Sequence, residues 1–243
     1  MTAPRVLLLE DDPAVRLFVQ MALEPLSVDL LSCATLAEAR LALADPSVRL
    51  VFTDLTLPDG SGLDLLQWLQ SRAQPPGGSC RTVVFSGGID PAMERQLKAL
   101  QVWRVLHKPA SVGSLMGCVT DALAADAQAA QPVLDAPQGD PVAEFFGGNR
   151  PLYDAYRSAC LLQLPADLAD GDLAACTGDA QALRRVAHNL KSVLSMLGEA
   201  PAAQQARATE EAAAAGAAES MRHGWQQLRG QVQVLLATGR APG

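Results

Sequence analysis

Apolar and polar positions follow a regular order along the first half of the chain. Short apolar runs alternate with stretches in which apolar residues recur at helical spacing, and these stretches begin near residues 13, 35, 62, 90 and 111. The apolar runs predict strands at residues 5–9, 28–31, 49–53, 81–85 and 102–106. Strand and helix therefore alternate five times, which predicts a five-stranded parallel sheet with helices on both faces.

The pattern changes after residue 125. Residues 126–141 lose periodicity and are rich in Ala, Gln, Pro and Asp, which is typical of a linker. The rest of the chain shows only helical spacing, and we expect helices at residues 142–162 (interrupted at Gly147 and Gly148), 164–175, 179–197, 201–215 and 217–237. The sequence thus predicts an α/β domain at 1–125, a linker at 126–141 and an antiparallel helical bundle at 142–240.

Composition excludes several classes of function. The 243 residues carry a net charge of -7, whereas a nucleic-acid-binding surface needs a basic face. The sequence shows no basic recognition helix, which argues against a transcription factor. The sequence contains no run of about 18 apolar residues, so we expect no membrane span. The start of the chain lacks the apolar core of a secretory signal. Five scattered cysteines without a CxxC motif indicate reduced thiols, so we expect a cytoplasmic protein.

Polar residues with chemical potential follow four of the predicted strands. Glu10 and Asp11 follow the first strand, Asp54 the third, Ser86 the fourth and Lys108 the fifth. Because the carboxyl ends of parallel strands meet at one edge of a sheet, we expect these side chains to converge.

Clustered carboxylates repel one another, and a hard divalent cation such as Mg²⁺ relieves that repulsion. We therefore interpret Asp54 as the acceptor of a phosphoryl group, with Glu10 and Asp11 holding Mg²⁺. Lys108 and Ser86 suit contacts to phosphoryl oxygens. Each residue also has an ordinary interpretation: Asp54 could solvate a turn, Ser86 could belong to a turn and Lys108 could be a solvated strand-end charge. Their convergence on one edge favours the functional interpretation.

Residues 1–125 resemble the receiver domain of two-component response regulators, a flavodoxin-like fold. The resemblance is carried by LLEDDP at 8–13, Thr53-Asp54, PDGSG at 58–62, Ser86-Gly87 and Lys108-Pro109. It implies that Asp54 is the phospho-acceptor and that Glu10 and Asp11 are metal-site acids. It also implies that the backbone carbonyl of Thr56 completes the metal site.

Two positions depart from that family. Val105 stands where receivers often carry the Tyr or Phe of a rotameric switch, and Ala110 stands where Phe is frequent. An aliphatic Val has little to swing, so the usual aromatic coupling between phosphorylation and the neighbouring helix face is not expected here.

The predicted helix at 179–197 carries a candidate phosphoryl acceptor, His188. An apolar stripe on this helix lies roughly 160° from His188, so we expect the imidazole to face outward. The small Ser192 lies one turn further on the same face, and Lys191 flanks the ring. A neutral ring nitrogen can attack phosphorus while Lys191 balances the phosphoryl charge. The alternative is an idle surface histidine, which is how we interpret His223; we interpret His107 as an ordinary strand-end residue.

The segment AHNLKS at 187–192, with Gly198 ten residues after His188, resembles histidine-containing phosphotransfer (HPt) domains. The resemblance covers about residues 142–240, and Ser192 replaces a glycine that is usual in the family. It implies that His188 carries a phosphoryl group.

The leading hypothesis is a phosphorelay protein. Asp54 would take a phosphoryl group from a sensor kinase or hybrid kinase, and His188 would exchange it with a receiver aspartate on this or another response regulator. The chain would catalyse its own aspartate phosphorylation and dephosphorylation, but it shows no ATP-binding motif. We expect neither nucleic acid nor membrane as a partner. The alternative is a binding adaptor controlled by phosphorylation of Asp54, in which His188 is idle.

Overall fold

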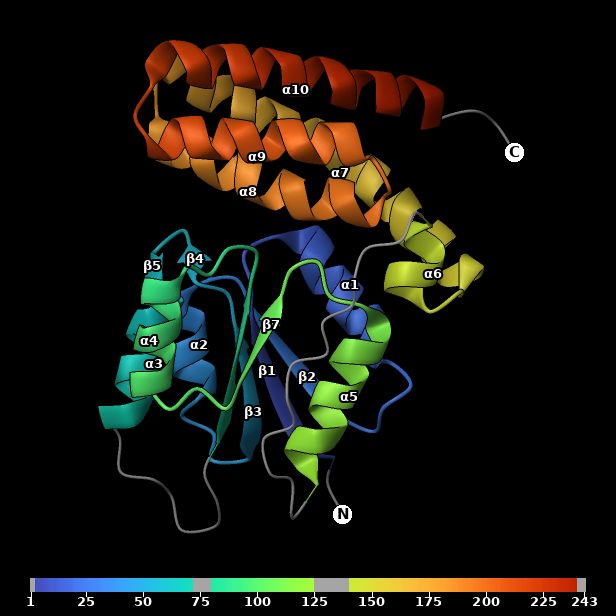
Figure 1. Cartoon of the computed structure of the whole chain (residues 1–243). Helices are drawn as coiled ribbons and strands as arrows, with labels where there is room; N and C mark the ends of the chain where they lie inside the picture. The colour runs from blue at the N-terminus through green and yellow to red at the C-terminus, as the bar shows by residue number, and fades with distance from the viewer. Residues whose placement is uncertain (1–2, 72–79, 125–139, 240–243) are drawn as a thin grey trace. The chain divides into compact units, whose positions relative to one another are not determined.

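The computed structural model describes residues 3–71, 80–124 and 140–239, and the chain divides into two compact units, Met1–Pro137 and Gln138–Gly243 (Figure 1). Nearly all of the predicted linker at 126–141 lies outside the described residues. Its last residue, Pro141, is already the first residue of a helix, with Asp140 as the N-cap.

The first unit contains the predicted five-stranded parallel sheet. Its order is β2-β1-β3-β6-β7, and its strands are β1 (Arg5–Leu9), β2 (Asp29–Cys33), β3 (Val48–Thr53), β6 (Arg81–Ser86) and β7 (Arg104–His107). β7 begins two residues later than predicted, because Gln101 adopts a left-handed conformation at φ 52° and the Val102 amide bonds back to the Leu97 carbonyl. As the sequence predicted, β1, β3, β6 and β7 are parallel neighbours in one sheet, so the polar residues that follow them lie at the same edge.

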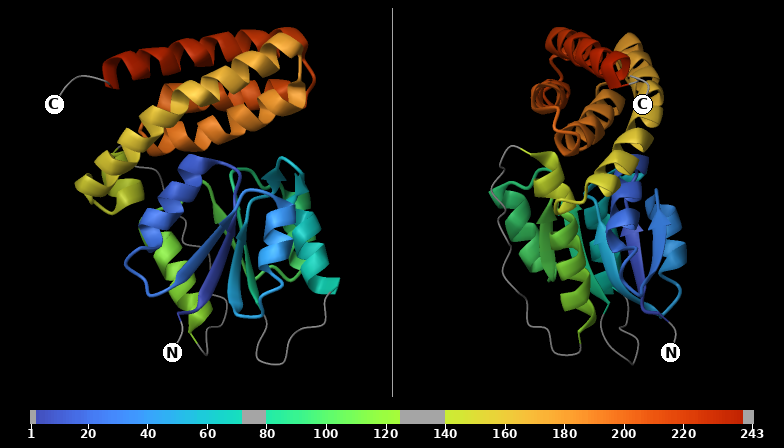
Figure 2. Two further views of the ribbon diagram at one scale, coloured as in Figure 1. Left: turned by 180° about the vertical axis from the view of Figure 1, so that it is seen from behind. Right: turned by 90° about the vertical axis from the view of Figure 1, so that its right-hand side faces the viewer.

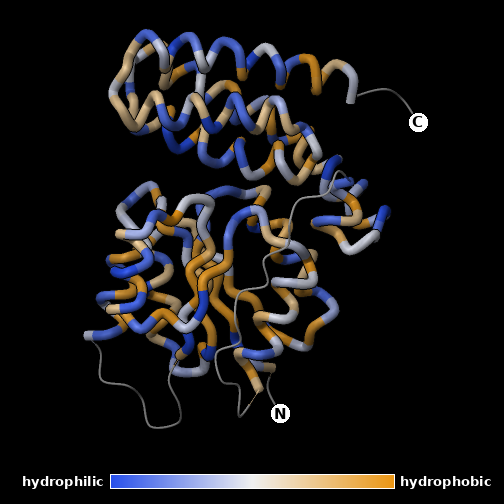
Figure 3. The backbone as a smooth tube through the Cα atoms, in the orientation of Figure 1, coloured by the Kyte–Doolittle hydropathy of each residue, from blue (hydrophilic) through white to orange (hydrophobic). Residues whose placement is uncertain are grey.

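Helices cover both faces of this sheet. α1 (Pro13–Leu23) and α5 (Val112–Leu123) lie on one face, and α2 (Leu36–Ala42), α3 (Gly62–Ser71) and α4 (Pro91–Ala99) lie on the other (Figures 1 and 2). The strands are the most hydrophobic part of the unit (Figure 3). Leu7, Leu9 and Val51 form a core with residues of α2 and α3, and this core holds the sheet rigid behind its polar edge.

A two-stranded hairpin that the sequence did not predict follows β3. It pairs β4 (Thr56–Leu57) with β5 (Gly60–Ser61) in antiparallel register, and Pro58 and Asp59 form its tip. The hairpin therefore lies between Asp54 and the start of α3.

The second unit is helical. Its elements are α6 (Pro141–Phe146), α7 (Arg150–Thr177), α8 (Ala180–Met196), α9 (Ala200–Ala214) and α10 (Ala218–Gly239). α8 packs against α9, α9 packs against α10, and α7 contacts both α8 and α10 (Figure 2). Gly147 and Gly178 adopt left-handed conformations where α6 and α7 end, which confirms the predicted interruption at Gly147 and Gly148.

α7 corrects one prediction. We expected separate helices at 142–162 and 164–175, but α7 runs without a break through Pro165. A proline inside a helix removes one hydrogen bond and crowds the preceding turn. Leu164 and Leu168, on either side of it, are both buried. Tertiary packing on both sides of the proline therefore outweighs its local preference.

α7 and α10 meet in a tight contact at Gly171. A β-carbon at this position would lie 2.1 Å from the Trp225 ring. The Trp225 Nε1 donates a hydrogen bond to Asp172 at 2.9 Å, and Arg229 forms an ion pair with the same carboxylate. The glycine thus admits an indole ring whose orientation is fixed by its neighbours.

Among the residues whose structure is described, no helix is both long enough and apolar enough to cross a membrane.

Candidate functional site

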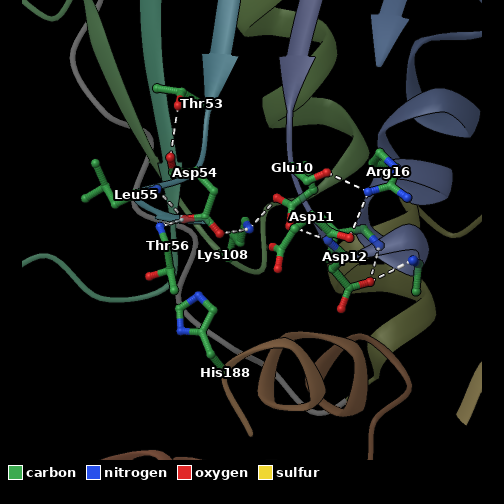
Figure 4. Close-up of polar contacts among 12 residues, drawn as sticks. Glu10, Asp11, Asp12, Arg16, Thr53, Asp54, Leu55, Thr56, Lys108 and His188 are labelled. Carbon is green, nitrogen blue, oxygen red and sulfur yellow. Dashed lines mark hydrogen bonds and ion pairs between the residues drawn. The ribbon is translucent and has the colours of Figure 1, made fainter. Parts of the chain in front are cut away.

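Three carboxylates gather at the carboxyl edge of the sheet in the first unit. Glu10 and Asp11 follow β1, and Asp54 follows β3 (Figure 4). One oxygen from each residue lies within 4.8 Å of the others. Glu10 and Asp54 have no exposed surface, and Asp11 is half-buried. The structure therefore brings together the acids that the strand pattern predicted.

The Asp54 carboxylate is held on both of its oxygens. Oδ1 accepts hydrogen bonds from the backbone amides of Leu55 at 2.5 Å and Thr56 at 3.3 Å. Oδ2 accepts one from Lys108 Nζ at 2.6 Å, and Lys108 also forms an ion pair with Glu10 (Figure 4). The Thr53 hydroxyl donates to the Asp54 backbone carbonyl at 2.9 Å. These contacts fix the carboxylate in one orientation.

The charges in this pocket do not balance. Burial raises the pKa of Glu10 to about 8, although attraction to Lys108 opposes the rise and repulsion from Asp54 adds to it. Burial acts to lower the pKa of Lys108, but Asp54 and Glu10 together raise it above its ordinary value. Among the described residues, the clustered carboxylates of Glu10, Asp11 and Asp54 are thus accompanied by a single ammonium group, that of Lys108. Carboxylate oxygens are the ligands that Mg²⁺ prefers, so this donor set fits a magnesium ion.

The loop after β1 is shaped by a residue that the sequence analysis did not single out. Arg16 Nη1 donates to the backbone carbonyls of Glu10 at 2.6 Å and Asp11 at 2.8 Å. Asp12 caps α1 by accepting from the Ala14 amide at 2.7 Å. Burial raises the pKa of Asp12, and the amide bonds at the start of the helix oppose that rise. Asp12 therefore serves as the N-cap of α1, whereas Glu10 and Asp11 contribute their carboxylates to the acidic pocket.

His188 lies on α8 in the second unit. Its Nδ1 is 2.8 Å from Glu210 Oε1 on α9, and Lys191 Nζ donates to Glu210 Oε2 at 2.5 Å. Burial acts to raise the pKa of Glu210, but the hydrogen bonds and charges of His188 and Lys191 lower it to about 2. An ionised carboxylate therefore links the two residues that the sequence singled out. Glu210 lies 22 residues from His188 along the chain.

The sequence predicted that His188 faces outward, whereas the ring is 5% exposed in the structure. The predicted apolar stripe is buried, as Leu183 and Leu190 show, but His188, Ser192 and Met196 form a second buried set on the same helix. His223, by contrast, is exposed and pairs with Gln227, and His107 is an exposed residue at the end of β7.

Comparison with known proteins decides the nature of the first unit. A protein-family model described as the response regulator receiver domain matches residues 6–120. This segment is a response regulator receiver domain. The response regulator protein PilR of Pseudomonas aeruginosa is 35% identical over 123 residues, which cover 51% of this chain and 27% of that protein. The chain thus spans about a quarter of the length of that relative.

Solved receiver structures are also similar to the chain. A signal receiver domain from Vibrio parahaemolyticus is 24% identical, with a TM-score of 0.46 over 50% of this chain and 90% of that chain. A response regulator receiver protein from Pseudomonas putida is 27% identical, with a TM-score of 0.45 over 49% of this chain and 98% of that chain.

Three further positions that the sequence singled out, Ser86, Thr56 and Val105, belong to β6, β4 and β7. Ser86 is 2% exposed at the end of β6, and its carbonyl accepts from the Lys108 amide at 3.0 Å. Thr56 is a half-buried residue of β4. Val105 is half-buried in β7 and packs with the apolar cluster that includes Leu97 of α4. An aliphatic residue thus occupies the place of the aromatic switch and is packed under the neighbouring helix.

Proposed function

We propose that the chain is a phosphorelay protein in which Asp54 of the receiver domain accepts a phosphoryl group and His188 passes one to or from a receiver aspartate. The observation that carries the first half is the Asp54 carboxylate, which is buried, held by two backbone amides and Lys108, and placed beside two further acids. The donor would be the phosphohistidine of a sensor kinase or hybrid kinase in the cytoplasm.

Transfer to Asp54 exchanges one bond for another. One carboxylate oxygen forms a bond to phosphorus while the bond between phosphorus and the donor nitrogen breaks, and the donor imidazole leaves with the electron pair. The amides of Leu55 and Thr56 keep the carboxylate from rotating, so that it meets the phosphorus in line. Lys108 donates to a phosphoryl oxygen as a positive point charge, and Ser86 offers a hydroxyl donor at the end of β6.

Glu10, Asp11, Asp54 and the backbone carbonyl of Thr56 would hold Mg²⁺. When bound, Mg²⁺ neutralises part of the negative charge on the transferring phosphoryl group. The resulting acyl phosphate is later hydrolysed by water, which returns Asp54 to its carboxylate. The domain would thereby catalyse its own phosphorylation and dephosphorylation.

For residues 142–240 we propose an antiparallel helical bundle of the histidine phosphotransfer type. Because Glu210 is ionised, it accepts a hydrogen bond, and Nδ1 of His188 therefore carries the ring proton. The lone pair of Nε2 is then the one that forms the bond to phosphorus, while the bond between phosphorus and the donor carboxylate oxygen breaks. Glu210 stabilises the positive charge that develops on the ring, and Lys191 holds Glu210 in place.

A second candidate function is a protein-binding adaptor that responds to phosphorylation of Asp54. The contact between His188 Nδ1 and Glu210 favours it, because this bond gives the imidazole a structural role that needs no phosphoryl group. In that function the helical unit contacts a protein partner, and His188 has a structural role and accepts no phosphoryl group. Neither candidate involves nucleic acid or a membrane as partner, whereas the relay requires a second response regulator or a transfer within the chain.

The test is labelling of the purified chain with a small acyl-phosphate donor and Mg²⁺, followed by mapping of the label. Phosphoaspartate is lost in base and phosphohistidine in acid, so the two acceptors separate chemically. The relay predicts a base-labile label that Asp54→Asn abolishes, and an acid-labile label that His188→Gln abolishes. His223→Gln is the matched control, since it changes an exposed histidine of the same unit.

Label that never reaches His188, from this receiver domain or from an added one, would contradict the relay and support the adaptor. Label on the receiver domain of the Asp54→Asn variant would contradict both functions.

A further inference from the structure

Asp59, at the tip of the hairpin that follows Asp54, contacts a different helix. Its Oδ1 accepts from the Leu36 amide at 2.9 Å, and its Oδ2 accepts from the Ala37 amide at 3.2 Å. Both amides belong to the first turn of α2, which lies more than 20 residues earlier in the chain. Asp59 thus serves as a cap for α2 from outside that helix.

The two bonds complete the start of α2. The first amides of a helix have no partner within it, and a side chain must supply one. Thr35 accepts from the Glu38 amide at 3.2 Å, and the Glu38 carboxylate accepts from the Ala34 amide at 2.7 Å. Asp59 accepts from the amides of Leu36 and Ala37, which neither of these two bonds involves. Bonds from backbone amides to a carboxylate at a helix start are among the stronger ones, because the acceptor is charged and the helix dipole favours it.

The other end of the hairpin sets the geometry around Asp54. The Thr56 amide bonds to the Asp54 carboxylate, and the Ser61 hydroxyl donates to the Leu55 carbonyl at 3.2 Å. Leu57 packs in the core with Leu36, but apolar packing has no direction and does not fix rotation of the hairpin. The paired bonds of the Asp59 carboxylate do have direction. They therefore restrain the rotation that would move the Thr56 carbonyl relative to Asp54.

We propose that Asp59 is a positioning residue of the phosphoacceptor site, which sets the Mg²⁺ affinity and the phosphorylation rate by tying the hairpin at 56–61 to the start of α2. This inference rests on the proposed function, since it assigns the Thr56 carbonyl and Asp54 to a magnesium site. Asp59 itself touches neither the metal nor the phosphoryl group.

The test compares Asp59→Ala with Thr35→Ala in the full chain. Both variants weaken the start of α2, but only the first releases the hairpin. Asp59→Asn keeps one carbonyl oxygen as acceptor and should fall between Asp59→Ala and the wild type. The readouts are amide hydrogen exchange at residues 55–61 without Mg²⁺, the Mg²⁺ dissociation constant by calorimetry, and the labelling rate with an acyl phosphate.

We expect Asp59→Ala to raise exchange at residues 55–61 and to weaken Mg²⁺ binding about tenfold, the size of effect typical of residues behind a metal ligand. Thr35→Ala should leave both unchanged within error.

Asp59→Ala with wild-type exchange and Mg²⁺ affinity would overturn the inference. So would an equal loss in Thr35→Ala, since the effect would then run through α2. A wild-type chain that binds no Mg²⁺ and takes no label would instead overturn the proposed function and this inference with it.

Discussion

Substitution of Gly62 by alanine tests how closely the backbone is packed around the acceptor. Gly62 is the first residue of α3, and its amide bonds back to the Leu55 carbonyl. A β-carbon at this position would lie 2.0 Å from the Asp54 carbonyl oxygen and 2.8 Å from the Thr53 hydroxyl oxygen. These neighbours are backbone and a short side chain, so neither can rotate away.

The size of the effect follows from that distance. Carbon and oxygen atoms in contact lie about 3.3 Å apart, so the start of α3 and the end of β3 must separate by about 1 Å. Overpacking of this kind costs about 1–3 kcal/mol in the free energy of unfolding. A displacement of about 1 Å in a reacting group can lower a rate about a hundredfold. We therefore expect Gly62→Ala to lose far more phosphorylation rate than its loss of folded protein explains.

The assay is the rate of label uptake from an acyl phosphate with Mg²⁺, corrected for the folded fraction from urea unfolding. Gly117→Ala is the matched control, because a β-carbon at that position in α5 would meet no atom within 4 Å. It should label as the wild type does and unfold at the same or a higher urea concentration. If Gly62→Ala labels at the wild-type rate with unchanged stability, the argument from backbone contact is refuted.

Three further predictions concern stability, each measured by urea unfolding. Gly171→Ala should destabilise the helical unit by about 1–3 kcal/mol, because the new β-carbon would lie 2.1 Å from the Trp225 ring. The control Gly230→Ala meets no neighbour and should be neutral or stabilising, so equal effects of the two substitutions would contradict this reasoning. Glu210→Gln should cost about 1–2 kcal/mol at neutral pH. The pKa of Glu210 is lowered from 4.5 to about 2, so its contribution is present above pH 4.5 and is lost as pH falls toward 2; a difference from wild type that persists at pH 2 would exclude this cause. The pKa of Glu10 is raised from 4.5 to about 8, so between these pH values the metal-free folded state holds a proton that the unfolded state has lost, and stability should fall as pH rises. Excess Mg²⁺ favours the ionised form and should remove that fall. The same fall with Mg²⁺ present would argue against Mg²⁺ binding at this pocket.

The amino-acid sequence alone was sufficient to predict the receiver fold and the acids of its pocket. Strands and helices are recognised by patterns within a few residues, and the carboxyl ends of parallel strands converge whatever the details of packing. Asp54, Glu10 and Lys108 therefore came together where the strand ends placed them. The N-cap of α8 at Asp179 and the apolar stripe of that helix were equally local and were also confirmed.

Tertiary structure decided what lies between elements that are distant along the chain. The bond between His188 and Glu210 depends on how α9 packs against α8, and the continuity of α7 through Pro165 depends on contacts on both sides of the proline. The bonds from Asp59 to α2 likewise join residues with no common pattern. Periodicity shows which face of a segment is apolar, but it contains no information about which neighbour covers that face. Only the packed fold supplies the partner atoms, and so only the fold shows which polar side chains are held in position.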